Sequence, residues 1–154
     1  MKINIYWILS LLYMVLIFIL SSYTIPIKTP SFSFFDKTAH IVEYGILASL
    51  IHLALRDRNV TKHKLFALAF MIAFLYGVSD EVHQYFVPGR NADIFDVLAN
   101  GVGAFCFLTL IQILSYQRSV FSFQLLKTIK NNHENAKARK NERTKKRLIS
   151  HRVR

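Results

Sequence analysis

Residues 80–90 read DEVHQYFVPGR, and they follow an apolar run, LFALAFMIAFLYG, at residues 65–77. The apolar run carries no charge and has the composition of a segment that lies within a membrane. Directly after it come two carboxylates, an imidazole, an amide and a guanidinium. Groups of this kind are costly next to lipid. We therefore expect their side chains to face a protein interior or a polar cavity.

Four apolar segments predict an all-α, polytopic membrane protein with four transmembrane helices. A bilayer core needs about 20 apolar residues, and segments of that order occupy residues 3–20, 36–55, 65–85 and 92–116. The prolines of residues 21–35 indicate a loop, and residues 87–90 (VPGR) indicate a turn. A cleaved signal peptide is the alternative for the first segment. Only Lys2 precedes it and no small-residue cleavage site follows cleanly, which favours a retained helix.

The charge of the chain is segregated. Residues 118–154 carry twelve Lys or Arg against two Glu, which is +10 of the formal net charge of +11. We therefore predict a transmembrane domain at residues 1–117 and a basic tail at residues 118–154. In the tail, residues 119–129 suit a short interfacial helix. The rest lacks the apolar residues needed to fold alone, so we expect it to be disordered.

Basic loops set the expected orientation. Lys2, residues 56–64 and the tail hold most of the Lys and Arg, so we expect both termini to be cytoplasmic. The turn at residues 87–90 is then outside, together with the polar starts of the second and fourth helices. We expect the tail to bind the anionic inner leaflet, with nucleic acid as the less favoured partner.

Polar side chains recur at helical spacing in the last three helices. Residues three or four apart share one face of a helix. The resulting stripes are Asp36, His40, Glu43, Tyr44 and Leu47 in the second helix, Tyr76, Asp80, His83 and Gln84 in the third, and Asp96, Asn100 and Gly103 in the fourth. With Glu81 included, carboxylates outnumber cations, so the group needs shared protons or a bound cation.

Simpler roles compete with a functional site. Asp36 and Asp93 suit the N-caps of the second and fourth helices, and Glu43 suits an ion pair with Lys37 or Arg90. The alternative for the whole polar group is a structural network that holds the helices together.

Arg90 follows Gly89 at the expected outer face. A guanidinium there suits a phosphate or carboxylate ligand. The alternative is that it pairs with Asp80 or Asp96 and fixes the helices to one another.

We expect no cofactor, with a divalent metal as the alternative; His40 and His83 also suit interior histidines that are satisfied by hydrogen bonds. The candidate ligands are His40, Glu43, Asp80 and His83. The single cysteine, Cys106, lies in an apolar run, so we expect a buried thiol rather than a ligand.

Four short motifs occur in order within residues 36–103. They are Asp36-Lys37-x-x-His40-x-x-x-Tyr44, Asp80-Glu81-x-x-Gln84, Pro88-Gly89-Arg90 and Asp96-x-x-x-Asn100-x-x-Gly103. Together they resemble the VanZ-like family of bacterial membrane proteins. The resemblance implies a small multi-pass protein of the bacterial cell membrane. It also implies a setting in the cell envelope, since the family's namesake is associated with resistance to the glycopeptide teicoplanin. It does not imply a reaction.

Two hypotheses for function follow. In the first, the protein binds an anionic lipid head group, a lipid-linked cell-wall precursor or the glycopeptide itself in an outward cavity, with Arg90 and Lys37 as anion contacts. In the second, it is a membrane-embedded enzyme that acts on a lipid-linked substrate, with or without a metal. Asp80 or Glu81 would then be the acid or base, assisted by His40.

Overall fold

The computed structural model describes residues 4–23, 34–56 and 60–152. These residues form four α-helices and no strand: α1 (Ile5–Ser22), α2 (Phe34–Leu55), α3 (Lys62–Phe86) and α4 (Ile94–Arg152). Each helix contains a stretch long and apolar enough to cross a membrane. The prediction of an all-α protein with four membrane-spanning helices is therefore confirmed.

Local sequence explains several helix ends. The side chain of Asn4 accepts a hydrogen bond from the backbone N–H of Tyr6, 3.0 Å away, at the start of α1. Thr61 caps α3 in the same way. Gly89 has a φ of 84°, which is the left-handed conformation that the turn predicted at residues 87–90 requires. The loop predicted at residues 21–35 lies mostly outside the described residues, as does the middle of the one at 56–64.

The chain divides into two compact units, Met1–Gln112 and Ile113–Arg154. The first contains α1, α2, α3 and the start of α4. The second unit begins near residue 118, the predicted start of the basic tail. We expected this tail to form a short helix and then to be disordered, but α4 continues as a helix to Arg152. Helix-breaking residues are absent from this part of the sequence, because no Gly or Pro follows Gly103.

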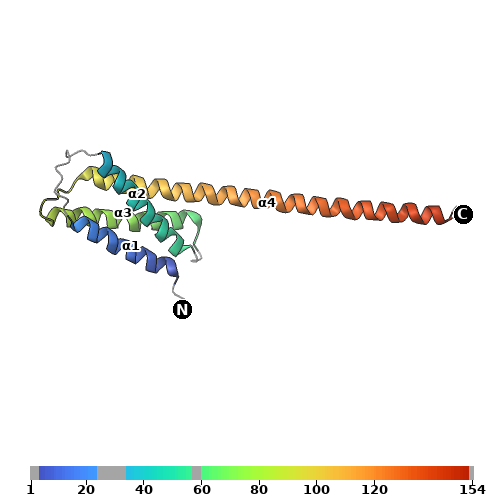
Figure 1. Ribbon diagram of the computed structural model, residues 1–154, viewed down its shortest axis with the longest axis horizontal. Helices are drawn as coiled ribbons and strands as arrows, with labels where there is room; N and C mark the ends of the chain where they lie inside the picture. Colours follow the sequence, from blue (N-terminus) through green and yellow to red (C-terminus); the bar gives the residue numbers. More distant parts are fainter. Residues whose placement is uncertain (1–3, 24–33, 57–59, 153–154) are drawn as a thin grey trace. The chain divides into compact units, whose positions relative to one another are not determined.

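The first unit is a bundle whose core is built partly from small residues. Figure 1 shows α1, α2, α3 and the start of α4 side by side, with the ends of α1 and α3 next to the starts of α2 and α4. The core residues are Ile17 of α1, Tyr44, Leu47, Ala48 and Ile51 of α2, Ala69 and Ala73 of α3, and Ala104 and Leu108 of α4.

Gly103 shows why small residues matter in this core. A Cβ added to it would lie 2.7 Å from Cα of Ile41. The backbones of α2 and α4 are therefore in direct contact at this level, as small residues allow between membrane helices.

The sides of the first unit are covered by large apolar side chains. Leu12 is 61% exposed, Leu75 58% and Val102 51%. A continuous apolar surface of this kind suits contact with lipid tails. Cys106 is also exposed, so the prediction of a buried thiol is wrong. An apolar run in a membrane helix includes lipid-facing as well as core-facing positions, and hydropathy does not separate the two.

Candidate functional site

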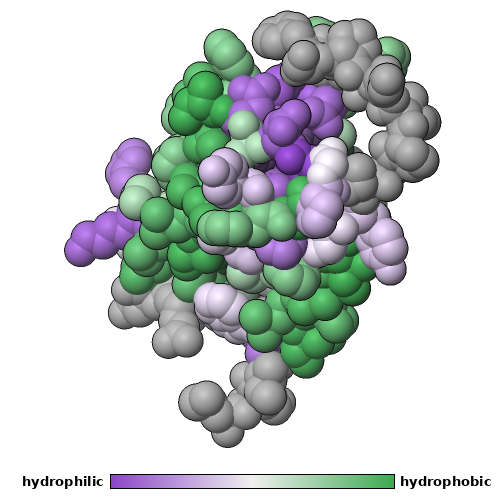
Figure 2. Space-filling view, turned by 90° about the vertical axis from the view of Figure 1, so that its left-hand side faces the viewer, coloured by the Kyte–Doolittle hydropathy of each residue, from purple (hydrophilic) through white to green (hydrophobic). Residues whose placement is uncertain are grey.

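The polar side chains gather at one end of the bundle, where α1 and α3 end and α2 and α4 begin. Figure 2 shows this end, with a group of hydrophilic side chains in the upper part of the view and hydrophobic ones to its left and below it. The buried polar residues here are His40, Asp80, Glu81, Gln84, Asp96 and Asn100. The three predicted stripes thus meet, and the convergence places polar groups from three helices at one level.

Lys37 joins α2 to the start of α4. Its Nζ donates to Oδ2 of Asp93, 2.6 Å away, and to Oδ1 of Asp96. The Lys37 ammonium lowers the pKa of the Asp93 carboxyl below its usual range, and the backbone N–H of Phe95 adds to the effect. Lys37 therefore neutralises carboxylates of the protein itself, those of Asp93 and Asp96.

Asp93 and Asp36 have different roles at their helix starts. Oδ1 of Asp93 accepts from the backbone N–H of Phe95 at 2.9 Å, one residue into α4, so its predicted capping role is confirmed. The cap predicted at Asp36 is wrong, because α2 begins at Phe34 and places Asp36 within its first turn. A carboxylate is still favourable there, near the positive end of the helix dipole.

His40 and Asn100 form the buried contact between α2 and α4. Nδ1 of His40 lies 2.9 Å from Oδ1 of Asn100. His40 is 6% exposed and Asn100 is fully buried. Gly77 of α3 makes room for this pair, since a Cβ there would lie 2.9 Å from Nδ2 of Asn100. The three helices therefore fix the orientation of the imidazole.

Arg90 and Gln84 connect the site to the ends of α3 and α1. Nε2 of Gln84 donates to Oδ2 of Asp80 at 3.0 Å. Arg90 donates to Oε1 of Gln84 at 3.4 Å and to the carbonyl oxygen of Leu20 at 3.3 Å. We expected Asp80 or Asp96 as the partner if Arg90 fixes the helices to one another. Arg90 instead contacts a side-chain amide oxygen and a backbone carbonyl oxygen. Both bonds are long, which marks them as weak.

The remaining predicted site residues occupy three different environments. Nε2 of His83 lies 2.9 Å from Oγ of Ser22, and its ring packs 4.4 Å from that of Phe18, so it faces α1. Tyr44 is fully buried in the core. Its hydroxyl is close enough to Asp80 for an electrostatic interaction but is not in hydrogen-bonding geometry. Glu43 is half-buried on α2, and its carboxylate interacts electrostatically with His40, Asp80 and Arg90.

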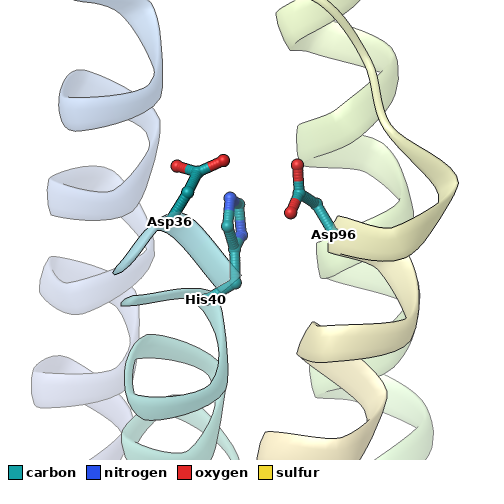
Figure 3. Close-up of side chains that lie close together, drawn as sticks. All are labelled: Asp36, His40 and Asp96. Carbon is teal, nitrogen blue, oxygen red and sulfur yellow. The ribbon is translucent and has the colours of Figure 1, made fainter. Parts of the chain in front are cut away.

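The candidate metal ligands are regrouped by the fold. Among the described residues, Asp36, His40 and Asp96 each offer one ligand atom, and these atoms lie within 4.8 Å of one another. Figure 3 shows the imidazole of His40 lying between the carboxylates of Asp36 and Asp96. Of the four ligands predicted from the sequence, this group contains His40 alone.

An open groove lies beside the polar cluster, between the end of α3 and the start of α4. Its volume is about 350 Å³, and its walls are mainly apolar, with Val82, Phe86, Ala92 and Val97 among them. Glu81 and Asp93 also line it. Oε2 of Glu81 accepts from the backbone N–H of Asp93 at 3.2 Å. The groove therefore combines an apolar wall with two carboxylates.

Several buried polar atoms have no hydrogen-bond partner among the described residues. Five of the six belong to the predicted polar group: the Tyr44 hydroxyl, Oδ1 of Asp80, Oε1 of Glu81, Nε of Arg90 and Nδ2 of Asn100. The sixth, Nδ1 of His52, lies in the last turn of α2. Buried polar atoms are normally paired with protein or ordered water. A concentration of unpaired donors and acceptors at one end is typical of a site that accepts a polar ligand or water.

Two parts of the site were not predicted. Asp93 was assigned only a capping role, although it also binds Lys37 and lines the groove. Its position three residues before Asp96 was a usable signal, because that spacing brings two side chains to one face. The apolar groove left no signal, since lipid-facing and ligand-facing apolar residues look alike in sequence.

Comparison with known proteins gives one match. A family model described as VanZ/LLP1 matches residues 5–115. The match covers α1, α2, α3 and the first part of α4, and it ends close to Gln112, the last residue of the first unit. No curated protein and no solved structure matches the chain.

Proposed function

The chain belongs to the VanZ/LLP1 family and is a multi-pass membrane protein, and from this premise we propose that it binds a lipid or lipid-linked envelope precursor at the polar end of its bundle. The observation that carries the proposal is the groove of about 350 Å³ next to the buried polar cluster. An amphiphile has both an alkyl chain and a polar head. The groove suits the chain, and the cluster suits the head.

Arg90 is the proposed contact for an anionic head group. Its two long hydrogen bonds are weak, and its Nε is buried without a partner. A phosphate could replace the amide and carbonyl oxygens with charge-assisted, bidentate bonds. Lys37 is less suited to this role than the sequence suggested, because it already binds Asp93 and Asp96.

The proposed side of action is the outer face of a bacterial cell membrane. The basic residues of the 56–64 loop and of the tail favour the cytoplasm under the positive-inside rule. Both termini are then cytoplasmic, and the polar end faces outward, where envelope precursors and glycopeptides are found. A protective role against teicoplanin fits this location.

Lipid retention in native mass spectrometry tests the proposal. The full chain is purified in detergent with a polyprenyl phosphate or phosphatidylglycerol as the probe. Ala92→Trp fills the groove, so we expect it to reduce retention by about tenfold, which corresponds to about 1.4 kcal/mol. Leu75→Trp places the same side chain on the exposed face of α3 and should leave retention unchanged. Equal retention by both variants would contradict the proposal.

A second candidate function is acid–base catalysis on a lipid-linked substrate. The observation in its favour is that Oδ1 of Asp80 and Oε1 of Glu81 are buried and unpartnered, and that Glu81 lines the groove. Asp80→Asn keeps the size of the side chain but removes its acid–base chemistry. If the protein is an enzyme, this variant should keep lipid retention but lose the protection against teicoplanin that the wild type gives to a susceptible strain. If Asp80→Asn keeps both lipid retention and protection, binding without catalysis is favoured instead.

A further inference from the structure

We propose that Asp36, His40 and Asp96 form a binding site for a divalent transition-metal ion. Two of the ligands come from consecutive turns of α2 and the third from the first turn of α4. Their ligand atoms lie within 4.8 Å of one another (Figure 3). Bound to one metal at about 2.1 Å each, three such atoms would be less than 4.2 Å apart. Only small movements of the side chains are therefore needed.

The orientation of His40 supports a metal ligand rather than a structural histidine. Its Nδ1 is next to the carbonyl oxygen of the Asn100 side chain, and a carbonyl oxygen can only accept a hydrogen bond. Nδ1 therefore carries a proton, and Nε2 is the ring nitrogen left to bind either a proton or a metal ion. His40 is 6% exposed, so the bundle holds its ring in place. Holding one ring nitrogen through an amide or carboxylate is the usual way in which proteins orient a metal-binding histidine.

The charges around the ring point to a missing cation. A lone pair between two carboxylates is electrostatically unfavourable unless a proton or a metal ion lies between them. Lys37 binds one oxygen of Asp96 and one of Asp93. The Lys37 ammonium is thus shared between Asp93 and Asp96, and the second oxygen of Asp96 remains for a metal.

The ligand types define the class of ion. An imidazole nitrogen with two carboxylate oxygens suits Zn²⁺, Mn²⁺ or Fe²⁺ and is less suited to Mg²⁺, which prefers oxygen alone. Three protein ligands leave further coordination positions open, as in catalytic rather than structural zinc sites. Asp36 is exposed, so an ion can enter from the polar end. The inference does not depend on the proposed lipid ligand, although a bound cation would attract an anionic head group.

Mn²⁺ binding to the purified full chain tests the site without any lipid probe. Mn²⁺ is added to protein in detergent, free ion is removed, and bound metal is counted by mass spectrometry. Pulsed electron paramagnetic resonance then shows whether an imidazole nitrogen is bound. We expect one Mn²⁺ per chain with a nitrogen coupling in the wild type. His40→Ala should abolish the coupling, and Asp36→Asn should weaken the affinity by tenfold or more.

Two variants make the result specific. Asp36 is exposed, so Asp36→Asn leaves the bundle packing unchanged and separates loss of metal from loss of fold. His83→Ala removes a histidine that contacts Ser22 and Phe18, outside the cluster, and should keep both the metal and the nitrogen coupling. A nitrogen coupling that survives His40→Ala, or a wild type without stoichiometric Mn²⁺, would overturn the proposal. Neither result would affect the lipid-retention test, which compares groove variants.

Discussion

The two parts of α4 form one continuous helix but are stabilised in different ways. Up to Gln112 the helix belongs to the bundle, and its buried residues are Asp96, Ala99, Asn100, Gly103, Ala104 and Leu108. From Ile113 onward, every side chain that the structure describes is exposed. The first part is held by contacts with α2 and α3. The second depends on helix propensity and on whatever surrounds it.

The two parts of α4 also differ in the residues that they supply. The first part supplies Asp96 and Asn100 to the polar site. The second part contains most of the basic residues and contributes none of the described site contacts. The family match ends at residue 115, close to the change from buried to exposed. The part of the chain that the family model matches is therefore almost the same as the bundle.

Gly103→Ala should have the largest effect on the bundle. The added Cβ would meet the backbone of Ile41, which no side-chain rotation can relieve. We expect the helices to separate at this level, at a cost of about 3 kcal/mol or more. Thermal unfolding in detergent, followed by size-exclusion chromatography, measures the effect.

Gly101→Ala is the matched control, because it makes the same change two residues earlier in the same helix. Its Cβ would lie 3.3 Å from the ring of Phe74, which is tight but can be relieved by a shift of that side chain. Alanine also gains up to about 1 kcal/mol in helix propensity. We expect stability close to that of the wild type. Similar losses for both variants would show that the α2–α4 contact is not the cause.

Lys37→Met should have the next largest effect. It removes the ammonium that pairs with Asp96, whose side chain is 6% exposed. Leaving a buried charge unpaired costs about 3–5 kcal/mol in a protein interior. Because Asp93 is 26% exposed and retains access to solvent, we expect about 2–3 kcal/mol here, again from thermal unfolding.

Two further variants test the electrostatic origin of that loss. Lys37→Met combined with Asp96→Asn removes both charges and should recover part of the stability. Lys64→Met makes the same change at an exposed position of α3 and should have no effect. If the double variant is as unstable as the single one, the role of Lys37 is packing rather than charge.

The sequence predicted the polar site better than it predicted the limits of the bundle. Carboxylates and a histidine at helical spacing within apolar segments could be placed on interior faces, because the cost of exposing them to lipid excludes most alternatives. His40, Asp80 and Asp96 were identified on this basis and are buried, whereas Asp36, identified with them, is exposed. Their grouping was not predicted, since it depends on how closely the helices approach one another at Gly77 and Gly103.

Positions without polar atoms were harder to predict. Cys106 was placed in the core and lies on the surface. Ala92 and Val97 line a groove that no pattern in the sequence reveals. In a membrane protein the exterior is as apolar as the core, so composition alone cannot decide between core, groove and lipid.

A third prediction makes one substitution in each part of α4. Leu108 is fully buried and Leu125 is 51% exposed. Leu108→Ala leaves a cavity, and such changes cost about 2–5 kcal/mol of stability at buried leucines. We expect the low end, about 2 kcal/mol, because a leucine side chain has a similar free energy in the bundle core and in lipid. Leu125→Ala should change the stability of the bundle by less than about 0.5 kcal/mol. Equal losses in thermal unfolding would mean that the exposed part contributes to the stability of the bundle.

The smallest effect on the bundle is expected from Asn132→Pro, in the exposed part of α4. Proline costs about 3 kcal/mol within a helix, and no tertiary contact of the described side chains here offsets that loss. We expect circular dichroism to show less helix, while the unfolding temperature of the bundle and its Mn²⁺ binding stay unchanged. Leu108→Pro provides the contrast and should prevent folding of the bundle. If Asn132→Pro also lowers the unfolding temperature, the helix beyond Gln112 stabilises the bundle and the two parts of α4 are not independent.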